Sequence, residues 1–116
     1  MRISDRIINP TLKRQIIKTL AQTLADCKDS EETLVFLKDF LKDNELETYA
    51  KRLAVSYWLK KGRSYENIKT NLKVSSATIA TIQNQLESEG YKLALKKMEA
   101  EEWANAWIEK IKKFVK

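Results

Sequence analysis

The stretch SYENIKTNLKVSSATIATIQNQL, residues 64–86, decides the fold of this chain. Its aliphatic residues are Ile68, Leu72, Val74, Ile79 and Ile82. The first two lie one helical turn apart and share a helix face, and the last two share the inner face of a second helix. Val74 falls in the polar break between the helices, where it can fill the corner. This spacing predicts two short helices that cross over a turn of about three or four residues, a helix-turn-helix.

The outward side of the second helix carries short, uncharged side chains. With the two isoleucines turned inward, the outward residues are Ser75, Ser76, Ala77, Ala80, Thr81 and Asn84. A solvated helix face usually carries Lys and Glu, whereas a helix that enters the major groove needs short side chains and groups that bond base edges. The pattern therefore favours DNA binding, although the aliphatic spacing alone also fits a compact helical domain without that function.

The composition favours an anionic partner and gives no sign of catalysis. Lys and Arg number 22 against 16 Asp and Glu, a formal charge of +6, although excess lysine also keeps small proteins soluble. The chain has no His and one cysteine, Cys27, which excludes an internal disulfide and the usual zinc sites. Neither paired acids nor a Gly-rich phosphate loop are evident. We therefore expect no catalytic residues, no metal and no cofactor.

The length of 116 residues fits one all-helical domain spanning residues 1–116. The first residues lack the apolar run of a signal peptide, and no segment is long enough to cross a bilayer. We therefore expect a cytoplasmic protein that makes no contact with a membrane.

Two Gly and one Pro in the whole chain predict an all-α fold, with about six helices. The expected N-caps are Asn9 before Pro10, Asp29 in a capping box with Glu32, Asp43 or Asn44, Ser64, and Ser75 or Ser76. Gly62 is expected just past the third helix, and Glu89-Gly90 at the end of the fifth. The expected apolar stripes are Leu12, Ile16, Ile17, Leu20 and Leu24; Leu34, Leu37, Phe40 and Leu41; and Leu46, Tyr49, Ala50, Leu53 and Tyr57.

A long C-terminal helix, expected at residues 91–116, has two apolar sides. Tyr91, Ala94, Leu95 and Met98 form one side, and Ala100, Trp103, Ala104, Trp107, Ile111 and Phe114 project roughly 180° away. One straight helix cannot bury both sides against the same body. Either the chain turns near residues 99–102, or the far half packs on another surface such as a second subunit. We favour the second subunit, because exposed tryptophans would form a costly apolar patch.

Four motifs resemble the Trp repressor superfamily, and within it the YerC/YecD-type branch of transcription regulators. They are AKRLA (50–54), KGRSY (61–65), SATI (76–79) and GYKL (90–93). The resemblance is clear over residues 45–98 and implies an all-α fold, an intertwined homodimer and operator DNA as the ligand. It places Lys69 at a DNA-contacting lysine of the family. It places Ser76, Ala77 and Ala80 where the recognition helix touches the groove.

The resemblance also reveals departures from the family. In the Trp repressor, two arginines sandwich the indole ring of the corepressor and a glycine leaves room for it. Arg52 matches the first arginine, but Thr81 stands at the second and Ile82 at the glycine. One cationic face is lost and a branched side chain fills the space, so we do not expect tryptophan to bind. For Arg52 we expect an ion pair with a nearby acid instead.

These residues predict how the chain meets DNA. The expected phosphate contacts are Arg63, Lys69 and Lys73. The expected base contacts are Ser75, Ser76, Ala77, Ala80, Thr81 and Asn84. Asn84 suits adenine, and the methyl group of Ala77 or Ala80 suits a thymine methyl. Because Arg and Lys are missing from this face, specificity should be modest and should depend on two half-sites in a dimer, about one helical turn apart.

Two further expectations complete the prediction. Lys73 replaces the glycine usual in the turn of the motif, and a left-handed backbone there would cost about 1 kcal/mol.

The alternative function is a protein–protein interaction module, in which the helix-turn-helix is only structural and the C-terminal Trp/Phe helix is the docking surface. Salt separates the two, because DNA binding through several lysines weakens steeply as salt rises, whereas apolar docking hardly changes.

Overall fold

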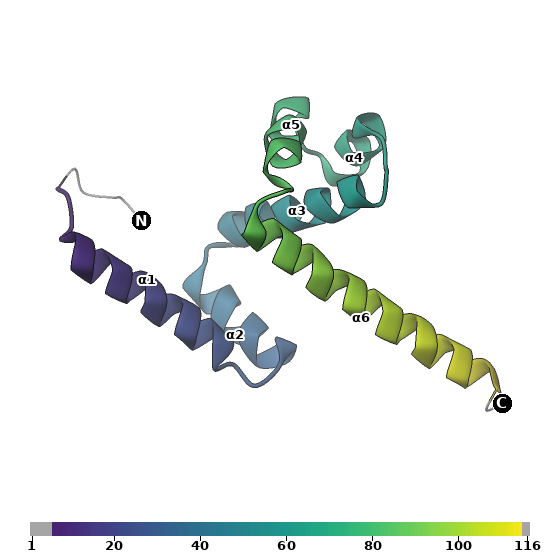
Figure 1. Cartoon of the computed structure of the whole chain (residues 1–116), viewed down its shortest axis with the longest axis horizontal. Coiled ribbons are helices and arrows are strands. Elements are labelled where there is room, and N and C mark those ends of the chain that lie inside the picture. The colour runs from purple at the N-terminus through teal and green to yellow at the C-terminus, as the bar shows by residue number, and fades with distance from the viewer. Residues whose placement is uncertain (1–5, 115–116) are drawn as a thin grey trace. The chain divides into compact units, whose positions relative to one another are not determined.

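Helices make up the regular structure of the residues described here. The structure is a computed structural model that describes residues 6–114, with side chains described as far as residue 102. The helices are α1 (Pro10–Ala25), α2 (Ser30–Phe40), α3 (Asp43–Lys60), α4 (Tyr65–Leu72), α5 (Ser76–Gln85) and α6 (Glu89–Phe114) (Figure 1). The predicted all-α fold is therefore confirmed. Within the described part, none of these helices has the length and apolar character needed to cross a bilayer.

The chain divides into two compact units, Met1–Leu46 and Glu47–Lys116. The division falls just inside the first turns of α3, so α1 and α2 belong to the first unit and the helix-turn-helix belongs to the second. Each unit has its own local structure. That residues 1–116 act as one domain stays a prediction.

In the first unit, the predicted helix starts are confirmed. The side chain of Asn9 accepts two backbone hydrogen bonds from the first turn of α1, at 2.8 and 3.2 Å, and Pro10 is the first helical residue. Asp29 caps α2 by accepting a hydrogen bond from the Glu32 N–H at 2.9 Å. The Glu32 carboxylate accepts a hydrogen bond from the Lys28 N–H at 3.2 Å. In a standard capping box it would accept from the N–H of the cap residue, Asp29.

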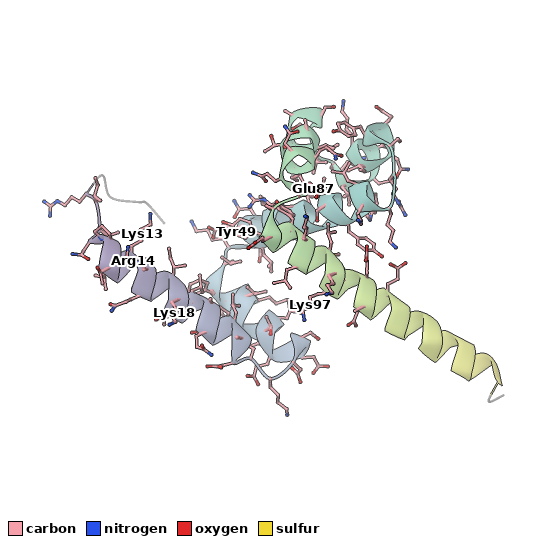
Figure 2. The ribbon with its side chains drawn as sticks, in the orientation of Figure 1. Lys13, Arg14, Lys18, Tyr49, Glu87 and Lys97 are labelled. Carbon is pink, nitrogen blue, oxygen red and sulfur yellow. The ribbon has the colours of Figure 1, made fainter. Side chains whose placement is uncertain are left out.

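The apolar side of the first unit is open to solvent in this chain. None of the residues in α1 or α2 is buried. Four large hydrophobic residues of α1 are 41–56% exposed, namely Leu12, Ile16, Ile17 and Leu20, and Leu24 is half-buried. The helix also carries Lys13, Arg14 and Lys18 (Figure 2) and has no acidic residue. Helices of this length have marginal stability without tertiary packing. We therefore expect the apolar side of α1 to pack against another surface.

The second unit has a core of buried aliphatic residues from α3, α4 and α5. Val55, Ile68 and Ile79 are fully buried, and Ile82 is 3% exposed. Partly buried residues packed against them are Trp58, Leu59, Leu72, Val74, Leu86 and Tyr91. Burying each aliphatic side chain contributes about 1.5–3 kcal/mol. All five aliphatics of residues 64–86 thus lie in or against one core, and α4 and α5 form the predicted helix-turn-helix above α3 (Figure 1).

The face of α3 that packs on this core differs from the predicted stripe. Val55 and Ser56 are the buried residues of α3, whereas Tyr49 and Leu53 of the predicted stripe are 47% and 41% exposed. α3 has apolar residues on two faces, and periodicity alone does not say which face the following helices cover. The Tyr49/Leu53 side therefore remains as apolar surface.

α3 begins earlier than predicted and ends as predicted. Asp43 is its first helical residue rather than its cap. At the other end, Gly62 has a φ of 82°, and its N–H donates to the Leu59 C=O at 3.0 Å. The Arg63 N–H donates to the Trp58 C=O at 3.1 Å. This pair of bonds is the Schellman motif, which favours glycine because its left-handed position is unstrained without a Cβ.

α5 ends earlier than predicted, and Glu89-Gly90 does not end it. The helix stops at Gln85, whose C=O accepts from the Ser88 N–H at 3.0 Å and the Ser88 hydroxyl at 2.8 Å. Glu89 and Gly90 are instead the first residues of α6. Leu86 packs against the core, and this tertiary contact turns the chain before Gly90 is reached.

α6 is one continuous helix, so the predicted alternative of a turn near residues 99–102 is wrong. Leu95 on its first side is 6% exposed. Glu102 ties α6 to α3, because it accepts a hydrogen bond from the Tyr57 hydroxyl and lies 3.0 Å from the Lys61 ammonium. The second apolar side, from Trp103 onward, lies outside the described side chains, so its packing on a second subunit stays a prediction.

Candidate nucleic-acid interface

The outward surface of α5 is open and uncharged. Ile79 and Ile82 are buried in the core. The residues predicted to contact bases are all exposed, namely Ser75, Ser76, Ala77, Ala80, Thr81 and Asn84. We call this set the α5 surface. Residues 75–84 contain no charged side chain. Another surface can therefore approach α5 closely without burying a charge of α5 and without charge repulsion.

The polar groups of the α5 surface differ in how far they are already bonded. The Ser75 hydroxyl accepts from the Thr78 N–H at 3.1 Å and bonds the Thr78 hydroxyl at 2.9 Å. The Thr81 hydroxyl donates to the Ala77 C=O at 3.0 Å. Within the described part of the chain, the Asn84 amide makes no side-chain hydrogen bond. Asn84 therefore keeps both its donor and its acceptor for an external partner.

Both helices of the motif begin with a predicted serine cap. Ser64 accepts a hydrogen bond from the Asn67 N–H at 3.1 Å, and Ser75 caps α5 as described above. The first turn of α5 contains no acidic residue. The partial positive charge at the start of α5 is therefore not offset by a carboxylate on its own first turn, and it favours an anion there.

The three predicted phosphate contacts are exposed cations without a carboxylate partner. Arg63, Lys69 and Lys73 are all exposed, and among the described residues no acid lies within 4.0 Å of their charged groups. Three other lysines of the second unit are paired, in the couples Lys51–Glu47 at 3.5 Å, Lys61–Glu102 at 3.0 Å and Lys92–Glu87 at 3.2 Å. The cations around the motif are thus available to a mobile anion.

Lys73 adopts the left-handed conformation considered for it from the sequence. Its φ and ψ are 56° and 50°, and no other non-glycine residue of the described part has a positive φ. This conformation costs about 1–2 kcal/mol for a residue with a Cβ. The turn of the motif therefore carries a strained lysine where glycine would be unstrained.

Two contacts between an arginine and an aromatic ring were not predicted from the sequence. The Arg63 guanidinium lies 4.0 Å from the centroid of the Trp58 ring, and the Arg52 guanidinium lies 5.4 Å from that of Tyr49 (labelled in Figure 2). The spacing from Tyr49 to Arg52 is a helical neighbour distance, which the sequence could have indicated. The Trp58–Arg63 contact crosses the chain reversal at Gly62, so no helical spacing signals it.

A hollow lies between α3 and α5 at the residues matched to the tryptophan pocket. It has a volume of about 380 Å³ and is lined by Arg52, Ala77, Thr78, Thr81, Ile82 and Gln85. The predicted loss of space is therefore incomplete, because room remains beside Ile82. Arg52 is the one cation of the lining, so the case against tryptophan depends on the missing second arginine.

The predicted ion pair of Arg52 is wrong. No acid among the described residues lies within 4.0 Å of its guanidinium, and its contact is with the Tyr49 ring instead. The Tyr49 ring, one helical turn earlier, holds the guanidinium by cation–π attraction, and Arg52 also lines the hollow.

The comparison with known proteins gives one family. A family model described as Trp repressor protein matches residues 15–99. The chain belongs to the Trp repressor family. The match includes every residue predicted to contact DNA and all of α2, α3, α4 and α5.

Two members similar to this chain agree with that assignment. The uncharacterized protein YerC of Bacillus subtilis (strain 168) is 30% identical over 93 residues, which cover 78% of this chain and 89% of YerC. The crystal structure of a TrpR like protein from Eubacterium eligens matches with a TM-score of 0.70 and 28% identity, covering 78% of this chain and 96% of that one. The YerC-type membership expected from the four motifs is confirmed. The roles of the individual site residues stay predictions.

Proposed function

We propose that this Trp repressor family member is a sequence-specific, repressor-like transcription regulator. It binds DNA as a homodimer and places α5 in the major groove. The observation that carries this proposal is the α5 surface, which is exposed, uncharged and short in its side chains while Ile79 and Ile82 anchor the helix from behind. A helix of about 10–12 Å diameter fits the major groove, which is about 12 Å wide.

The residues around α5 have the chemistry that this docking needs. Arg63, Lys69 and Lys73 contact phosphates on the two sides of the groove and set the register. Asn84 reads adenine through its free amide, and the alanine methyl groups meet thymine methyl groups. Because Ser75 and Thr81 already bond within α5, their hydroxyls contribute less to reading than the sequence predicted.

The exposed apolar surfaces support a homodimer. In the first unit they are the open side of α1, and in the second unit they include Tyr49 and Leu53. These two residues help line a mainly apolar hollow of about 530 Å³ between α3 and α6. A monomer seldom leaves so much large hydrophobic surface in water, and a second copy of the chain covers it.

The regulator does not respond to tryptophan. The hollow between α3 and α5 offers one guanidinium, Arg52, and presents the neutral Thr81 where the ring would need its second cationic face. DNA affinity should therefore be the same with and without added tryptophan.

Selection of duplexes from a random library, followed by fluorescence anisotropy over a salt series, tests the proposal. The wild type should bind the selected duplex with an affinity that falls steeply with salt. Lys69→Ala with Asn84→Ala should weaken binding at least about tenfold and lower the salt slope by about 1 per lost phosphate contact.

Lys96→Ala, which removes an exposed lysine from α6, is the matched control and should bind as the wild type does. Full affinity in the Lys69/Asn84 variant would contradict the proposal. Absence of duplex binding, together with salt-insensitive binding to a protein, would favour the interaction module.

A further inference from the structure

Trp58 lies beneath Arg63 and is fixed from behind by the core. Trp58 is in the last turn of α3, is partly buried, and packs against the cluster of Val55, Ile68, Ile79 and Ile82. The Arg63 guanidinium carbon lies 4.0 Å from the centroid of its ring. At this distance cation–π attraction holds a guanidinium over the ring, and the planar group of arginine is suited to stacking there. The ring is therefore a rigid support for an exposed charge.

The backbone brings the same two residues together. The Arg63 N–H donates to the Trp58 C=O at 3.1 Å, as the second bond of the Schellman motif at Gly62. The chain reverses there, so the Arg63 side chain returns over the last turn of α3. Both the main chain and the side chain of Arg63 are thus fixed to Trp58.

A third contact sets the rotation of the guanidinium. Arg63 Nη1 donates to Asn67 Oδ1 at 3.3 Å, in the first turn of α4. A guanidinium has five N–H donors, and the other donors of Arg63 have no acceptor within the described residues. One face rests on Trp58, one edge bonds Asn67, and the remaining donors are left for an anion beside the start of α4.

We propose that Trp58 is a positioning residue for DNA binding, which holds the Arg63 guanidinium ready to bond a backbone phosphate. This inference depends on the proposed function, because the phosphate belongs to the duplex bound by α5. An arginine on a flexible stem loses conformational freedom when it binds, and prior ordering removes that loss. Loss of the platform should weaken binding by about two- to tenfold per subunit, the range expected for immobilising one long side chain.

The alternative is that Trp58 only fills the core. A double-mutant cycle separates these roles, because residues that act through each other are not additive. Trp58→Leu, Arg63→Ala and the double variant are titrated with the selected duplex, after unfolding and sedimentation confirm the same fold and assembly. If Trp58 acts through Arg63, Trp58→Leu weakens binding in the wild-type background and has no further effect beside Arg63→Ala.

Two more variants keep the test valid if Trp58→Leu fails to fold. Arg63→Lys leaves the core intact and keeps the charge, but lysine lacks the flat group that stacks on the ring, so it should lose about the same affinity. Tyr57→Leu is the matched control. It removes a ring 5.4 Å from the Lys61 ammonium and the hydrogen bond from the Tyr57 hydroxyl to Glu102. The Lys61–Glu102 ion pair still joins α3 to α6, so DNA affinity should not change.

The free protein provides a readout without DNA. The Arg63 Nε–H and Cδ protons should be shifted upfield in NMR spectra by the Trp58 ring, and Trp58→Leu should abolish the shift. Additive losses in the cycle, wild-type affinity for Arg63→Lys, or an absent ring-current shift would each overturn the positioning role alone. Failure of the wild type to bind any duplex would overturn the proposed function and this inference together.

Discussion

At the scale of single residues, Lys73 shows a conflict between stability and binding. Its left-handed backbone, with φ of 56°, carries a cost of about 1–2 kcal/mol. Its side chain is one of the three exposed cations proposed to contact phosphates, and no acid among the described residues lies within 4.0 Å of it. Glycine would be unstrained at this position but would provide no charge.

Lys73→Gly should therefore stabilise the protein and weaken its binding to DNA. Relief of about 1–2 kcal/mol of strain is partly offset by about 0.4–1 kcal/mol of extra backbone entropy in the unfolded chain. The net gain should be about 0.5–1 kcal/mol in chemical denaturation, with a salt slope lower by about 1 per subunit. A variant that is more stable but has an unchanged salt slope would show that Lys73 does not contact phosphate.

At the scale of helices, a substitution of the serine cap of α5 can test folding and DNA recognition separately. Ser75 bonds the Thr78 N–H at 3.1 Å, and its side chain also lies on the α5 surface. Aspartate is as good an N-cap as serine, and its charge suits the positive start of a helix. The same carboxylate would face the phosphates of a bound duplex.

Ser75→Asp should thus fold with wild-type stability, within about 0.5 kcal/mol, and lose DNA affinity by roughly tenfold or more. Asn9→Asp is the matched control, because it makes the same kind of cap change at α1. It should affect neither property. Thermal unfolding and anisotropy on the same samples distinguish the outcomes, and undiminished affinity of Ser75→Asp would place α5 away from DNA.

The sequence predicted helix starts better than helix faces and ends. Asn9, Asp29, Ser64 and Ser75 cap helices as expected because a cap bonds its own first turn, within three residues of chain. The prediction of the inner face of α3 was wrong, because Val55 is buried only through its packing against α4 and α5. That information lies outside the helix.

The candidate site was predictable to a similar extent. The exposure of the α5 surface follows from the burial of Ile79 and Ile82 on the opposite side. The Trp58–Arg63 contact was missed because it depends on the tertiary reversal at Gly62. The predicted ion pair of Arg52 was wrong because its contact is with the Tyr49 ring, and no acid among the described residues lies within 4.0 Å of it.

At the scale of the whole molecule, the proposed function requires two copies of the chain. Large hydrophobic residues are exposed in both units, and the cations around one α5 suffice for only a few phosphates. The proposed homodimer would cover these apolar surfaces and double the contacts with DNA. Its two copies of α5 would then meet successive major grooves about one helical turn apart, roughly 34 Å along the duplex.

Methylation protection of the selected duplex reports directly whether α5 lies in the major groove. Purine N7 lies in the major groove, and adenine N3 lies in the minor groove. If α5 enters the major groove, guanine N7 should be protected in two clusters about one helical turn apart. Both clusters should be lost in the Lys69/Asn84 variant at equal protein concentration. Protection of adenine N3 alone, or a footprint that leaves every N7 reactive, would contradict the insertion of α5 into the major groove.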